Sequence, residues 1–216
     1  MSPVAPHRLP TAALRDALRR RLAVLPQEGG APRIGHYAGA DLERLASLMP
    51  PPAIRAAVLL PIIDRGDELS LLFTVRAANL AHHAGQIAFP GGRVEAADAD
   101  AVAAALRETE EEIGLLRDYV EVLGRLPDHA VITGYRVTPV VGLVRAGFEL
   151  SLDPIEVAGT FEAPLRHLLD PATHSRRTRQ LGDVEFETID LPWGQFNIWG
   201  ATAGMVLTLR EIMGGA

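Results

Sequence analysis

The amino-acid sequence predicts an α+β fold in which helices cover both faces of a mixed central sheet. Segments with strand-like and helix-like patterns interleave along the chain without regular βαβ spacing, which favours a mixed sheet over a doubly wound one. The chain has 216 residues, of which 48% are hydrophobic and 22% charged, so it can bury a sizeable core. It contains no cysteine, so packing must hold the fold without disulfides or Cys-ligated metals.

The first 50 residues are predicted to form an N-terminal helical extension, and residues 51–216 the main domain. Apolar residues recur with a helical period over 12–25 while the arginines of that stretch face elsewhere, which indicates an amphipathic helix. A short helix is expected at 41–48, and the prolines at 50–52 close the segment.

The main domain begins with a predicted β-hairpin. Two β-rich apolar runs, 54–63 and 69–76, are joined by the sequence Asp-Arg-Gly-Asp-Glu, which supplies turn chemistry. The same reasoning predicts further strands at 120–126, 136–144, 176–181 and 184–191, and helices at 101–113, 164–169 and 201–212.

The charge balance excludes several classes of function. Arginine supplies all 21 cations against 27 acidic residues, which gives a formal net charge of −6. Such a chain is a poor general nucleic-acid binder, because neutralising phosphates requires a basic surplus. The absence of lysine excludes Schiff-base chemistry and a Walker-type phosphate lysine.

Neither a membrane span nor a secretion signal is predicted. The longest apolar stretch, 56–63, is far short of the ~20 residues of a membrane helix, and Pro61 interrupts it. The first ten residues are rich in proline and contain no apolar signal core. We therefore expect a cytoplasmic protein whose partners include neither membranes nor nucleic acids.

The predicted helix at 101–113 carries an unusual concentration of acidic residues. Its periodicity places Glu108, Glu111 and Glu112 on the side opposite its apolar residues. Carboxylates at this spacing repel one another, so the arrangement requires a compensating cation, and hard divalent ions prefer such oxygen ligands. Arg107 precedes Glu111 by four residues and can orient its carboxylate, while Gly114 is placed to cap the helix.

A glycine turn precedes this helix. In Phe89-Pro90-Gly91-Gly92 the missing side chains let backbone carbonyls approach a metal or a phosphate. A glutamate-rich helix alone usually indicates a solvated face. The turn, the clustering of the glutamates and Arg107 together favour a functional site instead.

At these residues the chain resembles the Nudix hydrolase family. The family's box runs Gly, five residues, Glu, seven residues, then Arg-Glu-apolar-any-Glu-Glu-any-Gly-apolar. The residues that match it are Arg107, Glu108, Glu111, Glu112, Gly114 and Leu115, with Thr109 in an apolar slot. Asp98 stands where the box has its first Glu, with five residues between it and Gly92, and eight residues instead of seven separate it from Arg107.

A second set of residues is similar to the coenzyme A pyrophosphatase branch of that family. The spacing of Leu72-Phe73-Thr74-Val75-Arg76-Ala77, Gly85 and Phe89-Pro90-Gly91-Gly92 agrees with the branch pattern. Phe73 replaces a Leu, and Ala81 stands where an Arg is expected. The stretches 134–142 and 199–204 also resemble the branch, so the likeness runs from about residue 54 to the end.

The resemblance implies a Nudix-like α/β/α sandwich and a reaction. A Mg²⁺- or Mn²⁺-dependent enzyme would hydrolyse the diphosphate of coenzyme A, or of a derivative, to 4′-phosphopantetheine and adenosine 3′,5′-bisphosphate. The implied metal site consists of Glu108, Glu112, Glu111 and Gly92, and the implied catalytic residues are Glu111 and Arg107. Glu156, expected to precede a helix, is a second candidate for the general base.

The branch pattern also implies substrate-binding residues, namely Arg76, Thr74, Gly85, Phe89 and Pro90. His82 and His83 fit a loop or a substrate contact better than a metal site, since adjacent histidines point apart. The arginines Arg176, Arg177 and Arg179 alternate as on a strand, which fits a solvated strand or contacts to an adenosine 3′-phosphate. The aromatic residues Trp193, Phe196 and Trp199 fit a core better than a base-stacking site.

Two other functions remain compatible with the sequence: hydrolysis of another nucleoside diphosphate derivative such as ADP-ribose, and a silent nucleotide-binding module. The presence of all three glutamates, Glu108, Glu111 and Glu112, favours a catalytic protein over one that only binds a nucleotide. Free, oxidised and acylated coenzyme A are equally compatible as substrates.

The N-terminal helix can pack on its own domain or on a second copy in a homodimer.

Overall fold

The computed structural model describes residues 5–25, 31–35, 37–38, 42–77 and 85–214. In this part of the chain the main sheet has the order β1-β8-β9-β3-β4-β10, with β5 beside β4, β6 beside β3 and β7 beside β9. Its strands are β1 (Arg33–Ile34), β3 (Ile54–Asp64), β4 (Leu69–Arg76), β5 (Ile87–Ala88), β6 (Gly91–Arg93), β7 (Val120–Arg125), β8 (His129–Ala130), β9 (Tyr135–Arg145) and β10 (Val157–Pro164). A second, smaller sheet contains β2 (Tyr37–Ala38), β11 (Ser175–Leu181), β12 (Val184–Trp193) and β13 (Phe196–Ile198).

Five α-helices are described around these sheets. They are α1 (Thr11–Leu22), α2 (Leu42–Leu48), α3 (Ala101–Ile113), α4 (Leu165–Leu169) and α5 (Gly200–Ile212). Short 3₁₀ helices cover Pro6–Arg8, Arg117–Tyr119 and Pro171–Thr173. In the described part of the chain, no helix has the length and apolar content needed to cross a bilayer.

The main sheet is mixed, as predicted. Strand β3 runs parallel to β9 along its whole length and antiparallel to β4. The predicted hairpin between β3 and β4 is confirmed, because the Arg65 N–H donates to the Glu68 carbonyl at 3.0 Å and Gly66 takes a left-handed φ of 89°.

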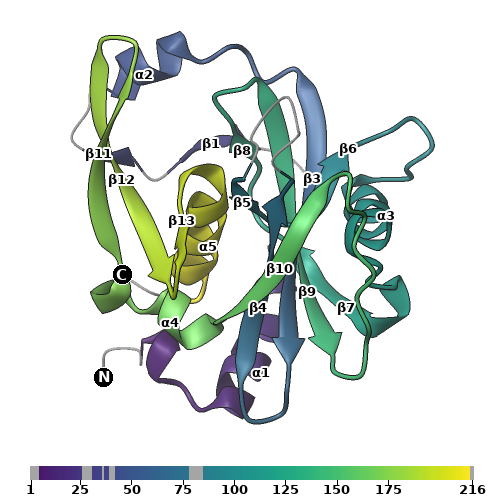
Figure 1. Cartoon of the computed structure of the whole chain (residues 1–216). Coiled ribbons are helices and arrows are strands. Elements are labelled where there is room, and N and C mark those ends of the chain that lie inside the picture. Colours follow the sequence, from purple (N-terminus) through teal and green to yellow (C-terminus); the bar gives the residue numbers. More distant parts are fainter. Residues whose placement is uncertain (1–4, 26–30, 36, 39–41, 78–84, 215–216) are drawn as a thin grey trace.

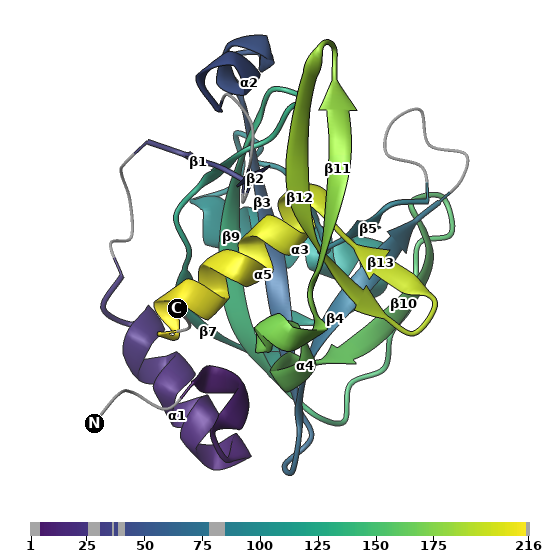
Figure 2. The same cartoon turned by 90° about the vertical axis from the view of Figure 1, so that its left-hand side faces the viewer.

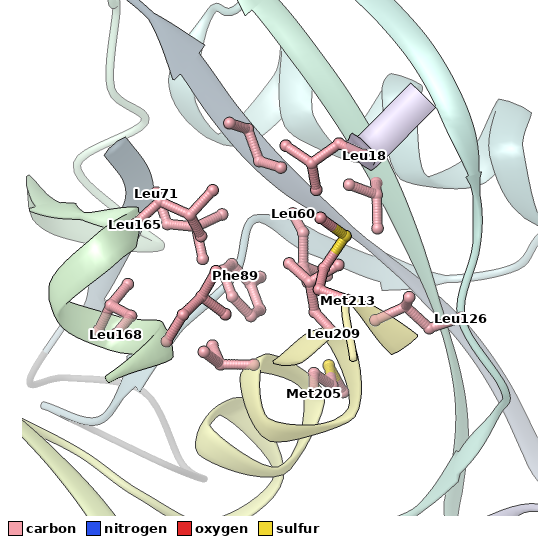
Figure 3. Packing of buried hydrophobic residues seen from close by; sticks show 14 of the residues in the cluster. Leu18, Leu60, Leu71, Phe89, Leu126, Leu165, Leu168, Met205, Leu209 and Met213 are labelled. Carbon is pink, nitrogen blue, oxygen red and sulfur yellow. The ribbon is translucent and has the colours of Figure 1, made fainter. Parts of the chain in front are cut away.

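Helices cover both faces of this sheet (Figure 1). Along β3, Leu60 and Ile62 join a core cluster with residues of α1, α4 and α5, whereas Leu59 and Ile63 join a second cluster with α3. Figure 3 shows Leu60 among side chains of α1, α4 and α5 in the first cluster. Since successive side chains of a strand point to opposite faces, an uninterrupted apolar run is what a doubly covered strand requires. The α/β/α sandwich is therefore confirmed.

The N-terminal segment shares this core. Leu14, Leu18 and Leu22 of α1 are fully buried in the same cluster as Leu60. Strand β1 extends the main sheet by pairing in parallel with β8, and β2 pairs with β12. Burial of three leucines contributes several kcal/mol, at about 2 kcal/mol per side chain.

Strands β11 and β12 form a long hairpin that extends away from the main sheet, with α2 near its tip (Figure 2). An ion pair between Arg44 of α2 and Asp183 in the hairpin turn joins the two. The hairpin returns to the sandwich through β13 and the start of α5.

Two local expectations were wrong. The stretch containing Glu156 leads into β10 instead of a helix, and β10 pairs with β4 over its full length. Its sequence mixes strand formers such as Val157 and Phe161 with Gly159, two alanines and a final proline, so the local pattern is weak and pairing with β4 decides its conformation. The expected glycine turn is in part a strand, because Gly91–Arg93 forms β6 against β3.

Candidate active site

Helix α3 has the predicted boundaries and is capped at both ends. The Asp100 side chain accepts a hydrogen bond from the Ala103 N–H at 2.8 Å, as an N-cap does. Gly114 takes a left-handed φ of 69° at the C-terminal end, as predicted. Buried residues such as Ala104 and Ile113 fix the helix on the sheet. Thr109 is buried in its apolar slot because its hydroxyl donates to the Ala105 carbonyl at 2.6 Å.

Arg107 joins three carboxylates at the start of the site. It donates to both oxygens of Asp98 at 3.0 Å, to Glu108 Oε1 at 3.1 Å and to Glu111 Oε2 at 2.9 Å. The predicted contact with Glu111 is thus present. The hydrogen bonds with Asp98 hold the pKa of that carboxyl below its usual range and raise the pKa of Arg107. Asp98, which departs from the family box, is the anchor of Arg107.

Glu108 lies directly against Gly92 of β6. A β-carbon at Gly92 would collide with the Glu108 carboxylate, so the absence of a side chain there is what allows the helix and the strand to approach. Burial raises the pKa of Glu108 above its usual range, and this effect exceeds the opposing hydrogen bond from Arg107. The hydrogen bond from Arg107 therefore does not fully offset the cost of burying the negative charge of Glu108.

Glu112 is the most buried acid of the helix, with 5% of its surface exposed. Its Oε2 accepts a hydrogen bond from the Gly91 N–H at 3.1 Å, and the nearest Arg76 nitrogen is 4.0 Å from Oε1. Burial raises the pKa of Glu112 to about 7, helped by the nearby charges of Glu156 and Glu108. A buried carboxylate with so little cationic compensation is suited to a metal ion.

The donor chemistry of this region fits a divalent cation. In the described residues no group of three or more acidic or histidine side chains converges into a preformed cage. Magnesium needs only one or two carboxylates, with water and substrate phosphates completing the shell. Glu108 and Glu112 supply such oxygens, and the lack of a side chain at Gly92 lets the Glu108 carboxylate lie against the backbone of β6. Glu111 is 59% exposed and is held by Arg107, so it lies at the rim.

Glu156 contributes to the same electrostatic environment. Its side chain is exposed, and its charge raises the pKa of both Glu108 and Glu112, so it faces the same region as those two acids. Its backbone carbonyl accepts from the Ala77 N–H at 2.8 Å, immediately after β4. Both candidates for the general base, Glu111 and Glu156, therefore border the acidic region.

Three of the expected substrate-binding side chains have structural contacts instead. Thr74 is buried, and its hydroxyl donates a hydrogen bond to the Ala88 carbonyl at 3.2 Å. Phe89 is 4% exposed and stacks on Phe73 with 4.9 Å between ring centroids, and Pro90 is also buried. These side chains shape the strand ends and do not offer a surface to a ligand.

Arg76 and Gly85 occupy more accessible positions. Arg76 lies at the end of β4 beside Glu112, and its buried Nε has no hydrogen-bond partner within the described residues. Gly85 donates its N–H to the Arg76 carbonyl at 3.0 Å and takes a left-handed φ of 71°. Ala81, His82 and His83 lie outside the described residues.

A pocket of about 410 Å³ opens beside this segment. One wall consists of Val75, Gly85, Gln86 and Ile87, and the other of Gln195, Phe196, Asn197 and Trp199. The second wall was not predicted, since the aromatic residues there had the pattern of a core. Phe196 does stack on Phe161, with ring centroids 3.8 Å apart, but Trp199 is 36% exposed. Nothing in the local sequence distinguishes an aromatic side chain packed in the core, such as Phe196, from one exposed at a pocket wall, such as Trp199.

Comparison with known proteins agrees with this geometry. The NUDIX domain family matches residues 53–176, more than half of the chain. The chain belongs to the Nudix family. The Nudix hydrolase NudL of Escherichia coli K12 is 43% identical over 162 residues, which cover 74% of this chain and 83% of NudL. NudL of Citrobacter koseri is 41% identical over the same length.

A solved structure shows the same fold. RenU, a Nudix hydrolase from M. smegmatis, superimposes with a TM-score of 0.51 at 20% identity, covering 74% of this chain and 86% of RenU. The family match and the NudL relatives show that this chain is a Nudix hydrolase, a family that generally uses divalent metal ions such as Mg²⁺.

Proposed function

We propose that this Nudix hydrolase cleaves the diphosphate of coenzyme A, or of a coenzyme A derivative, to 4′-phosphopantetheine and adenosine 3′,5′-bisphosphate. The observation that carries the proposal is the meeting of two segments. The segment that resembles the coenzyme A branch contains Arg76 and Gly92, and these residues contact Glu112 and Glu108 of α3. The proximity of Arg76, from the branch pattern, and Gly92, from the family box, to the acidic helix supports a single site that these segments share.

Glu108 and Glu112, with the backbone of Gly92 and with Glu111 nearby, would hold the divalent ion. When bound, Mg²⁺ or Mn²⁺ neutralises diphosphate charge and lowers the pKa of a coordinated water. Arg76 is placed to bind a substrate phosphate, because its Nε has no partner among the described residues and its guanidinium is 4.0 Å from Glu112.

Glu111 is the first candidate for the general base. Arg107 binds its Oε2 at 2.9 Å, which fixes the carboxylate and leaves Oε1 to accept a proton from the attacking water. The water oxygen bonds to phosphorus, and the bridging oxygen leaves with the other phosphate. Arg107 does not need to contact the substrate for this role, since it positions Glu108 and Glu111 together. Glu156 is the alternative base.

Product analysis tests the proposal. The protein is incubated with Mg²⁺ and separately with coenzyme A, ADP-ribose and a dinucleotide, and the products are separated and identified. We expect 4′-phosphopantetheine from coenzyme A, lost in Glu112→Gln and retained in Glu110→Gln. Glu110 is a matched control because it lies on the same helix and pairs with Arg117.

Cleavage of ADP-ribose or the dinucleotide without cleavage of coenzyme A would contradict the proposed substrate and retain the chemistry. Binding of nucleotides with no cleavage of any of them would contradict catalysis altogether.

A further inference from the structure

A second charged cluster lies on the β11–β12 hairpin, outside the acidic site. Its centre is Asp190, a fully buried carboxylate on β12. Arg179 Nη2 lies 2.9 Å from Asp190 Oδ2, and Arg177 Nε lies 3.4 Å from the same oxygen. Two arginines of β11 thus share one buried acid.

Two uncharged side chains donate further hydrogen bonds to this carboxylate. The Thr188 hydroxyl donates to Asp190 Oδ1 at 2.8 Å, and the Asn197 amide donates to Oδ2 at 2.7 Å. Within the described residues, no second carboxylate pairs with Arg177 or Arg179. The cluster therefore keeps one surplus positive charge, in a chain whose formal net charge is −6.

This positive cluster borders the 410 Å³ pocket. Asn197 and Trp199 belong to the pocket wall, and the Arg179 guanidinium carbon lies 3.8 Å from the centroid of the Trp199 ring. The cation thereby covers part of the indole, and the same Trp199 side chain lines the pocket. A pocket of this volume is within the range of small-molecule sites.

The opposite wall of the pocket connects to the acidic site. Gly85 and Gln86 line it, and both are hydrogen bonded to the backbone of Arg76. Arg76 in turn lies beside Glu112. The pocket therefore lies between the backbone neighbours of Arg76 on one side and Asn197 and Trp199, which contact the arginine cluster, on the other.

We propose that this pocket is the subsite for the nucleoside end of the substrate, with Arg177 binding a phosphomonoester on that end and Trp199 contacting its flat base. The inference rests on the proposed function, where the phosphomonoester is the 3′-phosphate of coenzyme A. Arg177 is the contact residue because its side chain is 64% exposed, whereas Arg179 is 25% exposed and is engaged by Asp190, Thr188 and Trp199. A guanidinium suits a phosphate because it donates hydrogen bonds in a planar fork.

The hairpin offers a matched control for Arg177. Arg176, the preceding residue of β11, is 69% exposed and pairs with Glu187 at 3.2 Å. Its side chain lies on the other face of the strand, since adjacent residues of a strand alternate. Arg176→Gln and Arg177→Gln remove the same charge from neighbouring positions, and Asp190 keeps Arg179, Thr188 and Asn197 in both variants.

Binding is measured first, by titration calorimetry with adenosine 3′,5′-bisphosphate and with 5′-AMP. We expect the native protein to bind the bisphosphate about tenfold more tightly, a typical gain for one charge-assisted contact. Arg177→Gln should abolish that preference and Arg176→Gln should preserve it. Trp199→Leu should weaken both nucleotides to a similar extent. Equal affinities in the native protein, or equal losses in the two arginine variants, would overturn the proposal.

Kinetics then separates this inference from the proposed function. With coenzyme A, Arg177→Gln should raise KM about tenfold at unchanged kcat, because the contact is the same in the ground state and the transition state. With dephospho-coenzyme A it should change neither constant. Failure of the native protein to cleave coenzyme A would contradict the proposed function, while the calorimetry still decides the subsite. Cleavage with a KM that Arg177→Gln leaves unchanged would contradict the subsite alone.

Discussion

The acidic site on α3 and the arginine cluster on β11–β12 have opposite charge imbalances. At the first, Asp98, Glu108 and Glu111 share Arg107, while Glu112 has Arg76 only at 4.0 Å. At the second, two arginines share Asp190. A carboxylate surplus at depth favours a bound cation, and a guanidinium surplus beside a pocket favours a bound anion. The two regions are therefore complementary to the two kinds of charge in a metal–nucleotide substrate.

The largest expected effect concerns Glu112. Glu112→Gln removes a buried carboxylate while keeping its shape, and should lower kcat by about 10³-fold if the acidic surplus serves to bind the catalytic cation. Steady-state kinetics with Mg²⁺ measures it, with Glu110→Gln as the control. A loss of less than tenfold would mean that the surplus at this site has no catalytic role.

The centre of the arginine cluster should behave differently. Asp190→Asn removes the buried acid that Arg177 and Arg179 share and leaves the largely buried Arg179 guanidinium without its carboxylate, so we expect the free energy of unfolding to fall by about 3 kcal/mol. Urea unfolding measures this change, and Glu187→Gln, which breaks only the exposed pair with Arg176, should cost less than about 0.5 kcal/mol. Equal effects in the two variants would show that Asp190 does not organise the cluster.

Gly92→Ala tests the geometry of the acidic site without altering its charge. The added methyl group would displace the Glu108 carboxylate, and we expect kcat to fall about 10²-fold, as for other displacements of about 1 Å at reacting groups. Gly159→Ala is the matched control, because that glycine also lies on a strand and has open space around its Cα. Equal kcat values in both variants would contradict the contact between Gly92 and Glu108.

The smallest expected effect is a change in the stability of the metal-free protein, and it shows whether Glu112 serves the cation site or the fold. With a chelator present at pH 8, Glu112→Gln should raise the free energy of unfolding by about 1 kcal/mol, because it removes a buried and poorly compensated charge. Chemical denaturation of both proteins provides the measurement. A clear loss of stability would indicate that Glu112 supports the fold instead of the cation site.

The sequence predicted the acidic site better than the arginine cluster. The boundaries of α3 and the contact of Arg107 with Glu111 depend on i, i+4 geometry and capping, which are local. The burial of Glu112 depends on the neighbouring strands β3 and β6, and the periodicity of the helix sequence contains no information about these strands. The contact of Arg179 with Asp190 requires the register that pairs Arg177 with Thr188 across β11 and β12. Such pairing is set by tertiary structure, so the alternating arginines alone left a solvated strand and contacts to an adenosine 3′-phosphate both open.

The helices and long strands were predicted because their periodic patterns are long. Strand β10 was missed because Gly159 and the surrounding alanines carry little strand propensity and depend on pairing with β4. The short strands β5, β6 and β13 have two or three residues, too few for a pattern.

Thermal unfolding with two ligands tests the central claim most directly. Melting temperatures of the native protein, Glu112→Gln and Arg177→Gln are compared with and without Mg²⁺, and with and without adenosine 3′,5′-bisphosphate, at constant ionic strength. We predict that Glu112→Gln loses the stabilisation by Mg²⁺ and keeps that by the nucleotide, whereas Arg177→Gln keeps the stabilisation by Mg²⁺ and has a smaller stabilisation by the nucleotide. Two variants that respond alike to both ligands would contradict the assignment of a cation to one cluster and an anion to the other.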